Sequence, residues 1–72
     1  MKILKIHTEY IELHQALKLS NIIQTGGEAK AYLYQNAIYV NGEIETRRGR
    51  KLYPGDVFKT PDGEFLIKDG SK

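Results

Sequence analysis

The sequence predicts an α+β domain in which two short helices pack on a small, bent antiparallel β-sheet. Apolar residues follow helical spacing between residues 12 and 35, and strand-like alternation begins after Asn36. Turn signals at residues 41–42, 54–56 and 60–63 then divide the second half of the chain into short strands. Because the 72 residues contain no repeat or linker, we expect a single domain, 1–72.

The first half of the chain begins with a β-leaning segment, KILKI, at residues 2–6. Helical spacing then predicts a helix over residues 12–20 that ends near Asn21, with Glu12 as an acid in its first turn. The apolar positions of this helix are Leu13, Ala16 and Leu17.

A second helix is predicted over residues 27–35. Thr25 or Gly26 is its expected N-cap, and Glu28 lies in its first turn. We expect Asn36 to end this helix in a left-handed conformation, which asparagine tolerates. The apolar stripe of this helix comprises Ala29, Leu33 and Tyr32.

The second half of the chain reads as short strands joined by tight turns. Asn41-Gly42 is a strong hairpin signal, and Pro54-Gly55-Asp56 and Thr60-Pro61-Asp62-Gly63 are further turns of defined chemistry. EFLIK, residues 64–68, is the predicted closing strand. We expect the tail after it to be frayed.

In this order, the segments resemble the small RNA-binding domain named after ribosomal small-subunit protein four, also called the αL motif. The resemblance covers about residues 11–58. Residues 38–42, IYVNG, match the family's strand and turn, and residues 52–57, LYPGDV, match its closing segment. The positions that match the two helices of the family are Leu13, Leu17, Ala29 and Lys30.

One position departs from the wider family pattern. The family has Ser-Arg at the start of the second helix, whereas this chain has Gly26-Gly27, so contacts made by that arginine are not carried over. The combination of TGG-x-AK with ETRRGRK is similar to the stand-alone subfamily of the YaaA and YbcJ type, in which the domain is essentially the whole polypeptide.

The resemblance implies a function as well as a fold. It implies non-catalytic binding of structured RNA, with ribosomal RNA as the leading candidate, and a role in ribosome assembly or translation. It also implies a bacterial, cytoplasmic setting. We expect the partner to be RNA or a ribosomal particle, with no membrane, cofactor or small-molecule substrate, and we expect the protein to be a monomer.

The strongest feature of the charge pattern is a basic segment. The formal net charge is +2, but the cations within residues 47–51 carry +4, so the rest of the chain sums to −2. Such an asymmetry indicates an anionic partner, although a solvated loop is the simpler interpretation. Arginine offers a planar fork that matches phosphate oxygens. The candidate phosphate-binding residues are Arg47, Arg48, Arg50 and Lys51.

The start of the second helix is a further candidate surface. Gly26 and Gly27 would let a ligand approach the N–H groups of a helix N-terminus, which attract anions. The alternative is an ordinary glycine-rich entry to a tight turn, and Glu28 would oppose a phosphate there. Lys30 and Lys18 are candidate contacts on the two helices, and Thr25 in the loop is a weaker one. Together with the basic segment, the second helix would form one concave positive surface.

Aromatic residues favour shape and phosphate recognition over base stacking. We assign Tyr32, Phe58 and Phe65 to the core. Partial exposure is expected for Tyr34, Tyr39 and Tyr53.

Other function classes find little support. The chain has no cysteine, and His7 and His14 lie in no catalytic or metal-binding motif, so we expect neither an enzyme nor a metal site. No apolar run reaches the roughly 18 residues of a membrane span, and the N-terminus lacks the pattern of a signal peptide.

Three rival interpretations stay open. One is a protein-interaction adaptor whose basic segment contacts an acidic partner. Another is a β-grasp sulfur carrier, which is disfavoured because the chain ends Gly70-Ser71-Lys72 without the required Gly-Gly and because its helices precede the VNG strand. The third is a DNA-binding helix-turn-helix, disfavoured because the basic residues follow the predicted hairpin turn instead of lying on the second helix.

Overall fold

The computed structural model describes residues 1–71 and places two helices and seven strands along them. The elements in chain order are β1 (Lys2–Ile6), β2 (Ile11–Glu12), α1 (Leu13–Leu19), α2 (Glu28–Gln35), β3 (Tyr39–Val40), β4 (Glu43–Ile44), β5 (Lys51–Leu52), β6 (Val57–Thr60) and β7 (Gly63–Asp69). The predicted α+β class is therefore confirmed, with both helices ahead of the strands that form most of the sheet.

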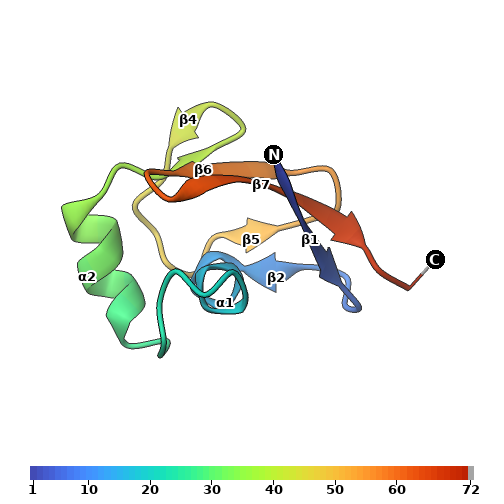
Figure 1. The fold of residues 1–72 in the computed structure, drawn as a ribbon, viewed down its shortest axis with the longest axis horizontal. Coiled ribbons are helices and arrows are strands. Elements are labelled where there is room, and N and C mark those ends of the chain that lie inside the picture. Colours follow the sequence, from blue (N-terminus) through green and yellow to red (C-terminus); the bar gives the residue numbers. More distant parts are fainter. Residues whose placement is uncertain (72) are drawn as a thin grey trace.

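The main sheet has five strands in the order β1-β7-β6-β3-β4, and β2 pairs with β5 in a separate ribbon (Figure 1). The pairs β3–β4, β3–β6 and β6–β7 are antiparallel, but β1 runs parallel to β7. The expectation of a wholly antiparallel sheet is wrong at this edge. A parallel pair needs a long crossover connection, and here the rest of the domain separates the first strand from the last.

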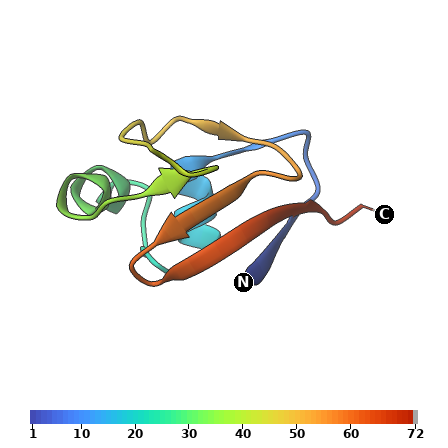
Figure 2. The ribbon, with the colours of Figure 1, turned by 90° about the horizontal axis from the view of Figure 1, so that it is seen from above.

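The core lies between the main sheet and a second layer made of α1 and the β2–β5 ribbon, while α2 covers one end (Figures 1 and 2). Phe58 and Phe65, cross-strand partners on β6 and β7, stack with their ring centroids 4.9 Å apart. The fourteen buried apolar residues are Ile6, Ile11, Leu13, Ala16, Leu17, Ile23, Ala29, Leu33, Ile38, Val40, Leu52, Phe58, Phe65 and Ile67.

Helix α1 agrees with its prediction to within one residue at each end. At its start, the backbone N–H of Glu12 donates to Oε1 of Gln15 over 3.0 Å, which fixes the entry of the chain. Past its end, Asn21 takes a left-handed φ of 62°, which stops the helical hydrogen-bond pattern.

Helix α2 ends differently from the prediction. Asn36 is extended, with φ −132° and ψ 143°, so the expected left-handed stop is wrong. Instead, both the backbone N–H and the side-chain Nδ2 of Asn36 donate to the carbonyl of Tyr32, over 2.9 and 3.0 Å. The asparagine side chain thus satisfies a helix-end carbonyl without a left-handed turn.

Two predicted turns, at residues 41–42 and 54–56, are joined by hydrogen bonds of Asn41 and Asp56. Asn41 and Gly42 have φ of 52° and 85°, as a tight hairpin turn requires. The Asn41 side chain donates from Nδ2 to Oδ1 of Asp56 over 3.0 Å, and its Oδ1 accepts the backbone N–H of Val57 over 2.9 Å. The other carboxylate oxygen of Asp56 accepts the backbone N–H of Tyr53 over 2.8 Å. These bonds hold the β3–β4 turn against the β5–β6 turn.

Candidate nucleic-acid interface

The basic segment, residues 46–51, is attached by its backbone to the start of α1. The N–H of Leu13 donates to the carbonyl of Arg50 over 2.8 Å, and the N–H of His14 donates to the carbonyl of Arg48 over 2.9 Å. The first N–H groups of a helix have no acceptors within the helix. Carbonyl groups of the basic segment serve as these acceptors for α1. The segment is therefore a fixed part of the fold and not a loose surface loop.

A buried carboxylate, Glu45, lies directly before this segment. Its side chain is only 6% exposed. Oε2 accepts from Nε of Arg47 over 3.0 Å, and Oε1 accepts from Nη2 of Arg47 over 3.0 Å and from Nη1 of Arg50 over 2.8 Å. The hydrogen bonds from Arg47, helped by Arg50, lower the pKa of Glu45 to about 2, although burial alone would raise that pKa.

Glu45 is the residue that sequence reasoning missed. Alternation along β4 would place Ile44 inside, yet Ile44 is 63% exposed and Glu45 is buried. The only sequence signal for this arrangement is a glutamate two positions before one arginine and five before another. Residues 47–51 alone carry a charge of +4. Together with the negative charge of Glu45, the local charge is +3.

The four cations consequently have different surroundings. Arg47 and Arg50 are held by Glu45, with 73% and 32% of their side chains exposed. The Nζ of Lys51 lies 4.9 Å from the ring centroid of Tyr10. Arg48 is exposed, and within residues 1–71 its side chain has no hydrogen bond or ion pair. Arg48 is thus the cation of this segment that is most available to a ligand.

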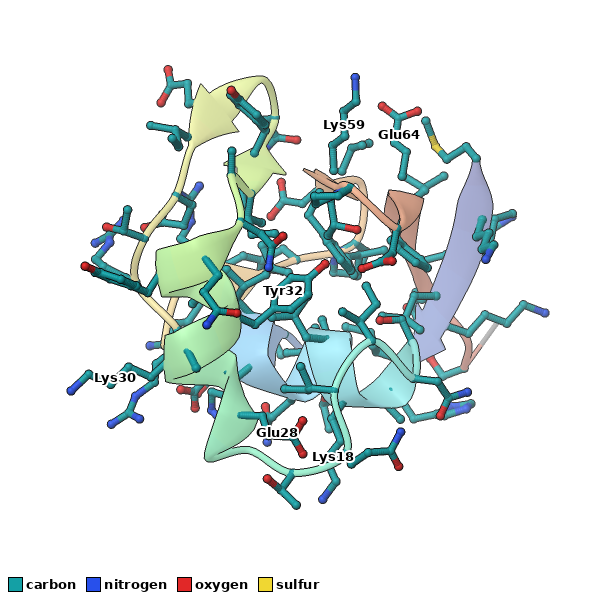
Figure 3. All side chains as sticks on the ribbon, turned by 60° about the vertical axis from the view of Figure 1, so that its left-hand side comes forward. Lys18, Glu28, Lys30, Tyr32, Lys59 and Glu64 are labelled. Carbon is teal, nitrogen blue, oxygen red and sulfur yellow. The ribbon has the colours of Figure 1, made fainter. Side chains whose placement is uncertain are left out.

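Arg48 faces a groove that the basic segment forms with α2. On the α2 side, Lys30 lines the same groove, and its side chain is likewise without an ion-pair partner in the described part of the chain. Figure 3 shows Lys30 on the outer side of α2, pointing into solvent. The complete lining of this groove, which we call the α2 groove, is Gly27, Lys30, Ala31, Leu33, Tyr34, Gln35, Thr46 and Arg48.

The other three cations of the segment border a second, open hollow. Its lining residues are Arg47, Gly49, Arg50, Lys51, Tyr53 and Asp56. The basic segment therefore presents Arg48 to the α2 groove and its remaining cations to this hollow. The structure brings Lys30 and Gly27 together with Arg48 in one groove. The other three cations border a different hollow, so the expected single concave surface is divided in two.

Lys18 and Gly26 lie elsewhere. Both line a hollow along α1 that also contains the carboxylates of Glu9 and Glu12, and Lys30 is not part of it. In Figure 3, Lys18 extends beneath α1 at the bottom of the view, apart from Lys30 at its left. Lys18 and Lys30 therefore lie on different surfaces. The nearby carboxylates make Lys18 a less favourable place for a phosphate.

The start of α2 already uses part of its hydrogen-bonding capacity. The N–H groups of Glu28 and Ala29 donate to the carbonyls of Thr25 and Gly26, over 3.1 and 3.2 Å. The Glu28 carboxylate turns back and accepts the backbone N–H of Thr25 over 3.1 Å. The N-cap of α2 is Gly27, so the expectation of Thr25 or Gly26 as N-cap is wrong, and no side chain caps this end. The bonds of the preceding turn leave fewer donors for an anion at Gly26 and Gly27 than the sequence suggests.

Phe58 and Phe65 lie in the core as expected, whereas Tyr32 and Tyr34 are more exposed than expected. Phe58 and Phe65 are buried, and Tyr32 is half-buried with its hydroxyl donating to Oδ2 of Asp62 over 2.6 Å. Burial, reinforced by this hydrogen bond, raises the pKa of Tyr32. Figure 3 shows Tyr32 pointing inward from α2. The most exposed tyrosine is Tyr34, at 91%.

Neither helix within residues 1–71 is long and apolar enough to cross a membrane. The same part of the chain holds no group of three potential metal-ligating side chains.

The fold and the site define a small α+β domain whose basic segment is fixed against a pair of helices. The family model of the S4 domain matches residues 4–68, so the chain belongs to the S4 domain family. It is also similar to the "Probable ribosome maturation protein RlbA" of Bacillus subtilis (strain 168), with 54% identity over 65 residues, 89% of this chain and 92% of that protein. Because the match covers nearly all of that relative, the expected kinship with stand-alone members is confirmed.

Proposed function

We propose that this protein is a non-catalytic RNA-binding protein that recognises structured RNA, with ribosomal RNA as its partner during ribosome maturation. The observation that carries the proposal is that Arg48 and Lys30 line the same groove, the α2 groove, in a chain that belongs to the S4 domain family. The name of the Bacillus subtilis relative supports the ribosomal setting.

The physical basis is phosphate binding by prearranged cations. Folded RNA presents closely spaced phosphates, and each Lys or Arg that neutralises one of them releases a condensed counterion. The backbone of Arg48 is fixed on α1 through its carbonyl, and Lys30 lies on α2. Because little backbone order has to be created on binding, more of the interaction free energy remains for affinity.

Arg47 and Lys51, in the adjoining hollow, extend this surface. We propose both as secondary phosphate contacts. Arg50 would have a structural role, because it forms an ion pair with the buried Glu45. Gly27 lines the α2 groove without a side chain to obstruct a ligand. We assign Gly26, Thr25 and Lys18 at most peripheral contacts. The protein would act as a monomer on an RNA or ribosomal particle in the bacterial cytoplasm.

The test is fluorescence anisotropy with labelled ribosomal RNA fragments, single-stranded RNA and duplex DNA over a series of KCl concentrations. We expect preference for folded RNA and an affinity that falls steeply with salt. Replacing Arg48 by Ala should reduce the slope of log K against log salt by about 0.7 to 0.9. Lys59→Ala is the matched control, because Lys59 is exposed on the sheet, away from Lys30 (Figure 3).

Co-sedimentation separates this function from that of a protein adaptor. We expect the protein to pellet with ribosomal subunits or their precursors and to be released when the RNA is digested. Retention on the particles after RNase digestion would point to an acidic protein partner. Salt-insensitive RNA binding, or equal effects of Arg48→Ala and Lys59→Ala, would contradict the assignment of the α2 groove.

A further inference from the structure

Tyr34 is exposed in an unusual place. Its side chain is 91% exposed, against 40% for Tyr39 and 43% for Tyr53. Tyr53 packs against Tyr10 with ring centroids 5.7 Å apart, whereas Tyr34 has no hydrogen bond or ring contact within residues 1–71. A single exposed aromatic residue is common on protein surfaces. This one borders the α2 groove beside Lys30 and Arg48.

The position of Tyr34 on α2 makes it a suitable platform for a flat ligand. The helix is anchored on the core by Ala29 and Leu33, and Asn36 caps its end. Residues four apart share a helix face, so Lys30 lies beside the tyrosine. Ala31, exposed and three positions earlier, is small enough to leave the ring accessible.

We propose that Tyr34 stacks on an unpaired nucleobase of the bound RNA, while Lys30 and Arg48 bind the phosphates that flank that nucleotide. This inference rests on the proposed function and deepens it, because it names the RNA element that the α2 groove selects: a bulged or loop nucleotide within a folded RNA.

The chemistry favours an unpaired nucleotide over a duplex. Bases within a helix are stacked on both faces, whereas a bulged base offers a free face to an aromatic ring. Stacking alone gives little selectivity among the bases, because every base has such a face. The two cations supply the phosphate contacts that hold the nucleotide over the ring. The sequence favours phosphate recognition without stacking; the α2 groove combines both.

The experiment compares two RNA hairpins that differ by one bulged nucleotide, 2-aminopurine, whose fluorescence falls when it stacks. We expect the wild-type protein to bind the bulged hairpin more tightly than the fully paired one and to quench the probe. Tyr34→Ala should weaken binding to the bulged hairpin by about 5- to 100-fold. Because no charge is removed, its salt slope should match that of the wild type.

Two further variants sharpen the result. Tyr34→Phe keeps the ring and should retain both the preference and the quenching. Tyr39→Ala is the matched control, because Tyr39 is a partly exposed tyrosine on β3 that lies outside the α2 groove. It should also behave as the wild type. Since the Tyr34 side chain is almost wholly in solvent, its replacement should leave the urea midpoint unchanged.

The outcomes distinguish the two proposals. A Tyr34→Ala variant that still prefers the bulged hairpin and quenches the probe overturns the stacking inference. Equal wild-type affinity for the two hairpins, with no quenching, overturns it as well but leaves RNA binding intact. A wild-type protein that binds neither the hairpins nor ribosomal RNA overturns the proposed function and this inference together.

Discussion

Glu45 and Arg50 form an ion pair beneath the basic segment, with Nη1 of the arginine 2.8 Å from Oε1 of the carboxylate. The same carboxylate holds Arg47 through two further side-chain contacts. A negative charge beneath the proposed phosphate-binding surface would lower its affinity for RNA if it acted by charge alone. Its burial and its fixed partners indicate instead that it orients the two arginines.

The first prediction concerns Glu45→Gln. The substitution removes a negative charge, so charge alone predicts tighter RNA binding. If Glu45 positions the arginines, affinity should instead fall several-fold, because the forks of Arg47 and Arg50 lose their anchor. Anisotropy at a fixed salt concentration measures this effect. Glu43→Gln is the control, since Glu43 is an exposed glutamate on β4 and its loss should leave binding unchanged or slightly tighter. Tighter binding by Glu45→Gln would refute the positioning role.

The second prediction concerns pH. The pKa of Glu45 is about 2 in the folded protein, against 4.5 for the ordinary carboxyl group. The unfolded chain therefore takes up this proton at a higher pH than the folded chain does, so stability falls as the pH is lowered from about 4.5 towards 2. The loss should be on the order of 2 to 3 kcal/mol in the free energy of unfolding.

Urea unfolding at a series of pH values measures this loss. Glu45→Gln carries no titrating group at this position, so its stability should depend less on pH over the same range. Parallel pH profiles for the wild type and the variant would show that the Glu45 ion pairs do not control the acid response.

The third prediction concerns the two interlocked turns. Asn41→Ala removes the bond to Asp56 and places alanine at a left-handed φ of 52°. We expect a loss of about 1 to 3 kcal/mol in the free energy of unfolding. Asp56→Ala should be similarly destabilising, because the N–H of Tyr53 loses its acceptor.

A double-mutant cycle checks whether Asn41 and Asp56 act together. The double variant should be less destabilised than the sum of the single variants, with a coupling of about 0.5 to 3 kcal/mol. Strict additivity would mean that the two turns are held independently. Asn41→Gly relieves the backbone strain while removing the side chain, and so separates those two effects.

The fourth prediction ranks the cations. Arg48→Ala should weaken RNA binding and reduce the salt slope without changing stability, because its side chain is exposed and makes no hydrogen bond or ion pair within residues 1–71. Arg50→Ala should lower stability, because it leaves the buried Glu45 with one arginine. Urea unfolding and salt titration of both variants test the ranking. If Arg50→Ala were as stable as Arg48→Ala, the structural role of Arg50 would be refuted.

Features that depend on neighbouring residues could be predicted from the chain alone. The helical spacing around Leu13 and Leu33 located both helices to within one residue at each end. The Asn41-Gly42 turn could also be predicted, because a tight hairpin turn requires residues that tolerate a positive φ. The resemblance to the S4 family rested on the same kind of short motifs. Each motif specifies a helix, strand or turn locally, and the order of these motifs along the chain matches the family.

Features that depend on distant residues were decided by the tertiary structure. The parallel pairing of β1 with β7 joins the two ends of the domain, so no local pattern could reveal it. Residues 47–51 contain four positive charges in the sequence. In the fold, the buried Glu45 forms ion pairs with Arg47 and Arg50. Arg48 forms none, and it lines the α2 groove together with Lys30. A charge count is a property of the chain; which charges reach solvent together depends on how the whole domain packs.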